Sequence, residues 1–166
     1  MYRKISDFEE DWRYESEMTL RVLRGLTDAS LDQRVTPEGR SIGRLAWHIT
    51  ASVAEMLEHA GLAVDGPPDT TEAPASAARI AAVYAEVAGD ALEAVTGKWT
   101  DEGLLEEVPM YGEMWRRGKA LDVLILHQTH HRGQLTVLMR QAGLTVPGCY
   151  GPAREEWAAF GMPAAK

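Results

Sequence analysis

Cysteine is almost absent from this chain, because Cys149 is the only one in 166 residues. A single cysteine excludes an internal disulfide, so the core must stabilise the fold, and it fits a reducing compartment. We interpret Cys149 as an ordinary residue of the C-terminal tail, with a metal ligand or a reactive thiol as the alternatives. At this length we expect one domain, residues 1–166, with a complete hydrophobic core.

Basic residues and long apolar runs are also scarce. The 17 Lys and Arg residues are outnumbered by 25 Asp and Glu, the formal net charge is -8, and the longest basic run is Arg116-Arg117 with Lys119 close behind. A phosphate backbone needs clustered positive charge, so we expect no nucleic-acid partner. No apolar run approaches the roughly 18 residues of a membrane span, and the N-terminus turns acidic where a signal peptide would be apolar. We therefore expect a soluble, cytoplasmic protein without a membrane partner.

Hydrophobic periodicity predicts an all-α protein, a four-helix bundle without a persuasive strand. The predicted helices span residues 6–26, 41–62, 73–95 and 118–142. Ser6 and Glu9 have the spacing of a capping box at the start of the first helix, and Ser41 is the expected cap of the second. Gly143 follows the fourth helix as a left-handed cap.

Two segments lie outside these helices. Residues 98–117 mix aromatic residues with Pro109 and Gly112, which predicts a long, ordered crossover loop that can include a short extended stretch. The C-terminal tail contains Pro147-Gly148 and Gly151-Pro152, followed by one or two predicted helical turns around residues 155–160. The chain has no internal repeat and no low-complexity tract.

The most informative stretch is His-Gln-Thr-His-His-Arg-Gly-Gln, residues 127–134. On an α-helix, His131 lies about 40° round from His127 and one turn further along, so both imidazoles can reach one ion. Leu124 and Leu135 lie on the same face, which we expect the bundle to bury. Two hydrogen-bonded core histidines are the alternative, but burying them without partners would cost roughly 1–3 kcal/mol each.

A third ligand has to come from His48, His59, His130, Cys149 or an acidic residue. His48 is the best candidate because the small Ser52, one turn on, leaves room for a cavity, although its place at the margin of the apolar stripe also suits a half-exposed surface histidine. His59 is 11 residues further along the same helix, roughly 16 Å, so the two histidines cannot share one ion. His130 lies on the flank of its helix, where it could bond a loop carbonyl or carry a proton.

These residues resemble the DinB-like or YfiT-like metal-binding four-helix bundles, which are distinct from the DNA polymerase that shares the DinB name. The resemblance rests on Leu45-Ala46-Trp47-His48-Ile49 and on the stretch 127–134, and extends over nearly the whole chain. It implies that His48, His127 and His131 bind a divalent ion, nickel or zinc. It also implies a homodimer. We suspect the margins of the first two helices, with Trp12 and Trp47, as the dimer face, and packing of Trp47 under a loop is the alternative. Some relatives are transferases or isomerases that use a low-molecular-weight thiol.

Three neutral imidazoles leave the charge of a divalent ion uncompensated. A bound water then has its pKa lowered towards about 7, and a bound thiol is deprotonated. We therefore expect a metal-dependent enzyme that activates a low-molecular-weight thiol for S-transfer or a water for hydrolysis. The alternative is a non-catalytic, dimeric metal-binding stress-response protein, which a closing fourth ligand such as Cys149, Glu15 or Glu55 would favour.

Further residues are candidates for supporting roles. Gln134 is expected on the inner face, where it could orient a ligand or a metal-bound water. Arg132 points away from the histidine pair and is expected to support a loop or a dimer contact. Glu15 is expected at the solvated margin of the bundle, with a role as the outer partner of a metal ligand as the alternative. Candidates for binding a thiol or its electrophile are Tyr111, Trp115, Arg116, Arg117, Arg132, Tyr150 and Arg154.

Overall fold

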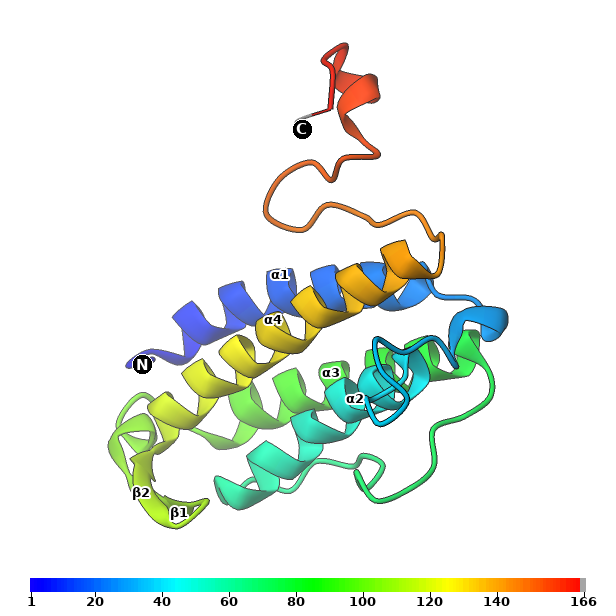
Figure 1. Cartoon of the computed structure of the whole chain (residues 1–166). Coiled ribbons are helices and arrows are strands. Elements are labelled where there is room, and N and C mark those ends of the chain that lie inside the picture. Colours follow the sequence, from blue (N-terminus) through cyan, green and yellow to red (C-terminus); the bar gives the residue numbers. More distant parts are fainter. Residues whose placement is uncertain (165–166) are drawn as a thin grey trace.

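The protein is described here by a computed structural model of residues 1–164, which contains four long helices (Figure 1). Their bounds are α1 Ile5–Arg24, α2 Ile42–His59, α3 Ala77–Lys98 and α4 Arg117–Gln141. A small hairpin, β1 Glu107–Met110 and β2 Glu113–Arg116, precedes α4, and three short 3-10 turns are η1 Asp28–Ser30, η2 Gly103–Leu105 and η3 Trp157–Phe160. The prediction of an all-α four-helix bundle is confirmed.

The order of the helices around the bundle differs from their order along the chain. α1 packs against α3 and α4, and α2 packs against the same two helices, so α1 and α2 lie on one diagonal. α1 and α4 run in the same direction, opposite to α2 and α3 (Figure 1). The backbone N–H of Tyr2 accordingly donates to the carbonyl of Gly118 at 3.0 Å, where α1 and α4 both begin. This arrangement makes α2 and α4 antiparallel neighbours.

The core is built from large side chains on α1 and small ones on α3. Phe8 and Trp12 on α1 are fully buried, and the Trp12 Nε1–H donates to the carbonyl of Ala88 at 3.0 Å. A helix backbone within reach of an indole requires small neighbours, which Ala88 and Ala91 provide. On α4, Leu124 and Leu135 are buried, so the face predicted for the histidine pair does turn inward.

Of the three predicted helix caps, those at Ser41 and Gly143 are confirmed and the one at Ser6 is wrong. Ser41 caps α2 by accepting from the N–H of Arg44 at 3.2 Å, and Gly143 follows α4 at a φ of 74°. The capping box at Ser6 is wrong: α1 begins at Ile5, whose N–H donates to Asp101 Oδ1 at 2.8 Å. A carboxylate from the loop after α3 therefore replaces the expected local cap.

α3 begins later than predicted. The helix starts at Ala77 instead of residue 73, and Ser76 accepts from the N–H of Arg79 at 3.4 Å. Asp28 Oδ1 accepts from the N–H of Ala77 at 2.7 Å, so a second orphan donor at this end is satisfied by the loop after α1. Pro74 lies in residues 73–76, which were predicted to be helical and are not. A proline disfavours helical geometry in the residue before it, so the helix does not extend through residue 73.

The crossover segment contains the short extended stretch that the sequence allowed. β1 and β2 pair antiparallel, with Val108 opposite Trp115. Tyr111 and Gly112 connect them with φ values of 52° and 87°, the two positive angles of a type I′ turn. A tyrosine in this left-handed region costs about 1 kcal/mol, so its side chain must make compensating contacts.

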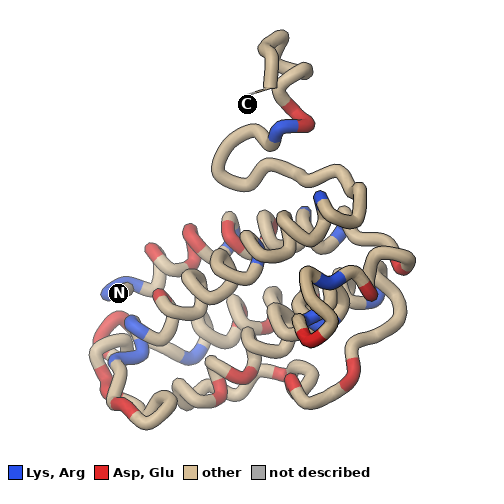
Figure 2. The backbone as a smooth tube through the Cα atoms, viewed as in Figure 1, with Lys and Arg blue, Asp and Glu red and all other residues tan. Residues whose placement is uncertain are grey.

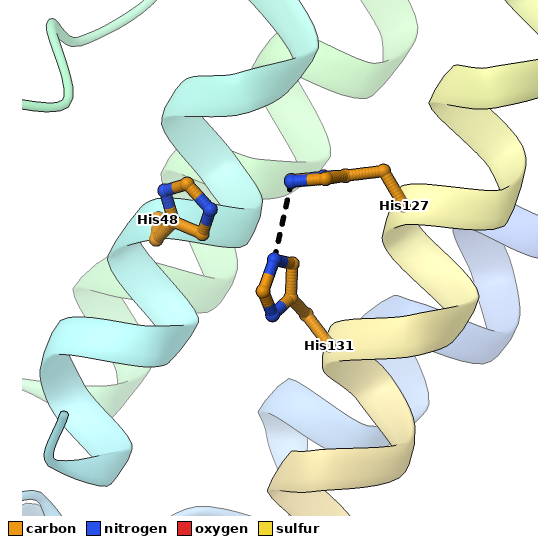
Figure 3. A group of neighbouring side chains, drawn as sticks. All are labelled: His48, His127 and His131. Carbon is orange, nitrogen blue, oxygen red and sulfur yellow. Dashed lines mark hydrogen bonds between the residues drawn. The ribbon is translucent and has the colours of Figure 1, made fainter. Parts of the chain in front are cut away.

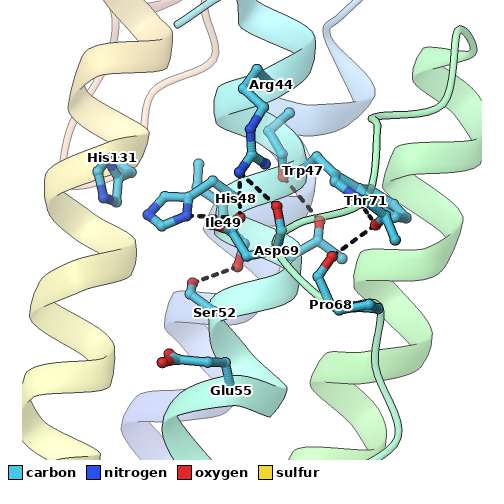
Figure 4. Close-up of polar contacts among 12 residues, drawn as sticks. Arg44, Trp47, His48, Ile49, Ser52, Glu55, Pro68, Asp69, Thr71 and His131 are labelled. Atoms are coloured by element: carbon cyan, nitrogen blue, oxygen red, sulfur yellow. Dashed lines mark hydrogen bonds and ion pairs between the residues drawn. The ribbon is translucent and has the colours of Figure 1, made fainter. Parts of the chain in front are cut away.

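The two tryptophans suspected of forming a dimer face are both inside the protein. Trp12 is 0% exposed and Trp47 is 6% exposed. The Trp47 Nε1–H donates to Thr71 Oγ1 at 2.9 Å, so Trp47 packs beneath the segment that joins α2 to α3 (Figure 4). Of the two interpretations of Trp47, packing under a loop is confirmed and an exposed interface residue is wrong, because the connection between α2 and α3 covers the margin of α2.

Acidic residues occur on all four long helices, and the Lys and Arg positions near the hairpin are interspersed with acidic ones (Figure 2). Within residues 1–164, no helix has the length and apolar character needed to cross a membrane.

Candidate metal centre

Three histidines from two helices face one another in the space between α2 and α4 (Figure 3). The ring centroids of His127 and His131 are 4.4 Å apart, and that of His48 lies 5.1 Å from His127 and 4.7 Å from His131. One ring nitrogen from each residue lies within 4.8 Å of the other two, so the three could hold one metal ion. The antiparallel pairing of α2 with α4 brings these residues together across about 80 positions of sequence.

The distance between the Nε2 atoms of His127 and His131 fits coordination of one shared metal ion. Nε2 of His127 and Nε2 of His131 are 3.1 Å apart. Two nitrogens at about 2.0–2.1 Å from one ion, separated by an angle between a right angle and the tetrahedral angle, would be about 2.8–3.4 Å apart. The two side chains on α4 are therefore already at the separation that shared coordination requires.

His48 is oriented by a carboxylate on the segment before α3. Its Nδ1 lies 3.0 Å from Asp69 Oδ1, and Arg44 Nη2 lies 2.9 Å from the same oxygen (Figure 4). Burial by itself would raise the pKa of Asp69, but hydrogen bonds from His48 and Arg44 outweigh it and hold this pKa below its ordinary value. An ionised Asp69 accepts the Nδ1 proton of His48, which leaves Nε2 bare for a metal.

His131 is oriented in the same way by an amide. Its Nδ1 lies 2.8 Å from Gln134 Oε1, which can only accept, so Nδ1 holds the proton and Nε2 is bare. The amide nitrogen of Gln134 lies 3.1 Å from His130 Nε2 and donates to it. Gln134 thus has the orienting position that the sequence suggested, although the residue itself is exposed. His130 is also exposed and lies outside the donor group.

His127 is kept neutral by its surroundings. Burial, reinforced by the neighbouring histidines, lowers its pKa from 6.5 to about 4. Its Nδ1 is buried and has no hydrogen-bond partner among the described residues, in contrast to His48 and His131. A neutral imidazole is the form that binds a metal, so the ring is prepared for ligation without losing a proton.

Gln128 fixes the distance between the two helices that carry the histidines. The residue is fully buried, and its amide nitrogen donates to the carbonyl of Ile49 at 2.9 Å and to Ser52 Oγ at 3.3 Å. Gln128 neighbours His127 on α4, and Ile49 neighbours His48 on α2. This contact therefore connects α2 and α4 directly beside the three histidines.

A cavity of about 310 Å³ adjoins the cluster. It is lined by His48, Ser52, Glu55, Met56, Asp69, Tyr111, Val123 and His127. Ser52 forms part of the wall as the sequence suggested, because its small side chain leaves space next to the His48 ring. The cavity is large enough for a small organic ligand beside a metal ion.

Glu15 and Arg132 form a separate site between α1 and α4. Arg132 Nη2 lies 2.6 Å from Glu15 Oε2, and both side chains are buried. Tyr150 of the tail donates to the same carboxylate at 2.7 Å and contacts Arg132 as well. Glu15 is therefore neither a solvated residue nor a partner of the three histidines. Arg132 contacts Tyr150 of the tail, in agreement with its expected role in supporting a loop.

The remaining candidates lie apart from the cluster. His59 is exposed, with Nε2 at 3.2 Å from Glu55 Oε1. Cys149 is half-buried in the tail, where burial raises the pKa of its thiol, and it is not part of the donor group. Among the candidates for thiol binding, Tyr111 lines the cavity, and the others do not: Trp115, Arg116, Arg117, Arg132, Tyr150 and Arg154.

Asp69 and Gln128 were not identified as site residues from the sequence. Asp69 lies in a connection, where no periodicity specifies the direction of a side chain. Gln128 could have been identified from the sequence, because it stands next to His127 on a helix face that was expected to be buried. A buried amide requires hydrogen-bond partners on the facing helix.

An antiparallel α2–α4 pair that joins three imidazoles defines the protein as a helical bundle with a candidate metal centre. The chain belongs to the DinB family, whose model matches residues 1–165. It is 42% identical to the uncharacterized protein YrdA of Bacillus subtilis over 166 residues, which is 100% of this chain and 99% of that protein.

Two solved structures share the fold. A DinB-like protein from Bacillus cereus ATCC 10987 has 44% identity and a TM-score of 0.87, over 90% of this chain and 100% of that chain. The DinB-like protein YjoA from Bacillus subtilis has 18% identity and a TM-score of 0.67, over 86% of this chain and 96% of that chain. The second similarity is one of fold alone.

Proposed function

We propose that the protein binds one divalent metal ion through Nε2 of His48, His127 and His131. The observation that supports this proposal is the meeting of three imidazole donors within 4.8 Å of one another. Asp69 and Gln134 hold the protons of His48 and His131 on Nδ1, so the donor atoms are bare where they meet. Nickel and zinc both accept imidazole ligands and are the ions we expect.

We further propose that the site is catalytic. When bound, the ion would act as a Lewis acid that lowers the pKa of a low-molecular-weight thiol or of a water. The cavity lined by Ser52, Met56 and Val123 supports this function over a purely structural one, because it offers space beside the donors. A structural site would be closed by a fourth protein ligand, and none of the described residues joins the group of three histidines.

Elemental analysis of protein purified without a chelator tests the metal site. We expect about one nickel or zinc ion per chain in the wild type, and a loss of most of it in His48→Ala and His131→Ala. His59→Ala is the matched control, because His59 is an exposed histidine of α2 outside the cluster. Wild type that binds no ion after addition of nickel or zinc would contradict the proposal.

A rate assay separates the catalytic function from the structural one. The metal-loaded protein is expected to accelerate the consumption of cysteine by an aryl halide, and removal of the metal should abolish the effect. Ester hydrolysis by the same samples tests activation of water. A loaded protein that is inactive in both assays would favour the non-catalytic alternative.

A further inference from the structure

The cavity beside the histidine cluster contains one carboxylate that no Lys or Arg of the described residues neutralises. Among the described residues that line it, none is Lys or Arg, whereas Glu55 and Asp69 are both acidic. Asp69 is neutralised locally, because Arg44 and His48 both contact its Oδ1. Glu55 is therefore the carboxylate of this cavity whose charge is not met by a Lys or Arg in the structure.

Glu55 lies at the end of the cavity remote from the histidine cluster. It follows His48 by seven residues on α2, which is two turns and about 10.5 Å along the helix axis. Figure 4 shows His48 and Glu55 extending from the same side of α2, toward α4. The floor between them is formed by Ser52 and Met56, which are buried. A ligand in the cavity would thus have the cluster at one end and a carboxylate at the other.

Tyr111 holds this carboxylate in place from the tip of the hairpin. Its hydroxyl donates to Glu55 Oε2 at 2.8 Å, and its ring packs 5.1 Å from His59 and 5.9 Å from Trp115, measured between centroids. The residue has a φ of 52° in a turn where glycine or asparagine would be relaxed. A strained tyrosine that lines a cavity and bonds its acidic residue indicates a role in that cavity.

Both carboxylate oxygens of Glu55 have one contact in the structure, and both can accept further hydrogen bonds from a ligand. Oε2 accepts one hydrogen bond from Tyr111, and Oε1 lies 3.2 Å from His59 Nε2. An ionised carboxylate offers about four acceptor positions, so one or two additional N–H donors can be accommodated. Ammonium groups are suited to this because their charge is complementary and they carry three donors.

We propose that the cavity binds a small aminothiol, a molecule with a thiol at one end and an ammonium group at the other. The thiol would lie at the histidine cluster, and the ammonium group would pair with Glu55. This inference rests on the proposed function, because it takes the cluster to hold a divalent ion that attracts the thiol. The positive ion and the negative carboxylate, at opposite ends of a mostly apolar cavity, select a ligand of this polarity.

The test compares two thiols that differ only in the distal group, 6-amino-1-hexanethiol and 6-hydroxy-1-hexanethiol. Their dissociation constants are measured by calorimetry on metal-loaded protein at low ionic strength, after the metal content of each sample has been determined. We expect the wild type to bind the aminothiol about fivefold more tightly, the factor typical of a partly exposed ion pair. Glu55→Gln should remove this preference and leave the affinity for the hydroxythiol unchanged.

Glu58→Gln is the matched control, because Glu58 is an exposed carboxylate of α2 that does not line the cavity. It makes the same change of charge and should retain the fivefold preference. Metal-loaded wild type that binds both thiols equally would overturn the inference alone, and so would a preference that survives in Glu55→Gln. Wild type without metal would instead overturn the proposed function, and the inference with it.

Discussion

Asp69 is the side chain with the largest predicted effect on the metal site apart from the three histidines. It accepts from His48 Nδ1 at 3.0 Å and fixes both the tautomer and the direction of that ring. We expect Asp69→Ala to weaken metal binding by about 10–100-fold, as removal of such partners does at other histidine sites. Competition with a chromophoric chelator measures the change.

The control for Asp69 is Asp65→Ala. Asp65 is an exposed carboxylate of the same connection and does not line the cavity, so its removal makes the same change of charge. Equal metal affinity in the two variants would mean that Asp69 does not orient His48.

The lowered pKa of His127 predicts the direction of a pH effect on the metal-free protein. This pKa is about 4 in the folded state against 6.5 as the ordinary value, so the unfolded chain takes up a proton first as the pH falls. The contribution of His127 to stability is therefore present above pH 6.5, decreases as the pH falls toward 4, and changes no further below that. Urea denaturation in the presence of a chelator at several pH values measures it.

His127→Gln provides the comparison, because glutamine does not titrate. We expect the free energy of unfolding of this variant to decrease less between pH 6.5 and pH 4 than that of the wild type. Parallel pH profiles for the two proteins would contradict the assignment of a neutral, partly buried His127.

Side chains on helices could be predicted better than side chains on connections. His127 and His131 are four residues apart in a continuous helix, so their common face follows from the helical repeat alone. Asp69 and the cover over Trp47 both belong to the connection between α2 and α3, whose path no periodic pattern specifies. This is why the sequence identified the histidines of the cluster but left the environment of Trp47 open and did not identify Asp69.

At the level of helices, the buried Glu15–Arg132 pair links α1 to α4 beside the metal site. The side chains of Arg132 and Glu15 are only 3% and 11% exposed. Arg132→Met would leave the carboxylate of Glu15 buried without its cation, and we expect it to lower the free energy of unfolding by about 3–5 kcal/mol. Chemical denaturation of the metal-free protein measures the loss.

The double variant Glu15→Leu/Arg132→Met tests the cause of that loss. Removing both charges eliminates the uncompensated carboxylate, so we expect it to recover more than half of the lost stability. A double variant that is no more stable than Arg132→Met would show that packing of the arginine, and not its charge, stabilises this contact.

The starts of α1 and α3 depend on hydrogen bonds to residues far away in the sequence, which local sequence patterns do not reveal. α1 begins at Ile5 because Asp101, far along the chain, accepts from its N–H. α3 begins at Ala77 with help from Asp28. Where the cap is local, as at Ser41 and Gly143, the sequence prediction was correct. At 107–116 the sequence predicts no more than a short extended stretch, because each strand of the hairpin has only four residues and β1 contains Pro109.

The arrangement of the four helices as a bundle brings the three histidines of the candidate metal centre together. Periodicity predicts how many helices there are and which faces are apolar, but not that α2 is antiparallel to α4 and diagonal to α1. The resemblance to DinB-like bundles implied that His48 meets His127 and His131, and the structure adds the directions and neighbours of the helices. The homodimer implied by the same resemblance stays a prediction, and its suspected face at Trp12 and Trp47 is buried.

X-ray absorption spectroscopy of the metal-loaded protein tests the central claim most directly, because it identifies the atoms bound to the ion. We expect three imidazole nitrogens at about 2.0–2.1 Å, with the remaining positions occupied by oxygen donors and no sulfur. His131→Ala should lose most of the bound ion and, with it, the imidazole signal. A sulfur neighbour at about 2.3 Å, which would assign Cys149 as a ligand, or fewer than two imidazoles in the wild type, would contradict the account.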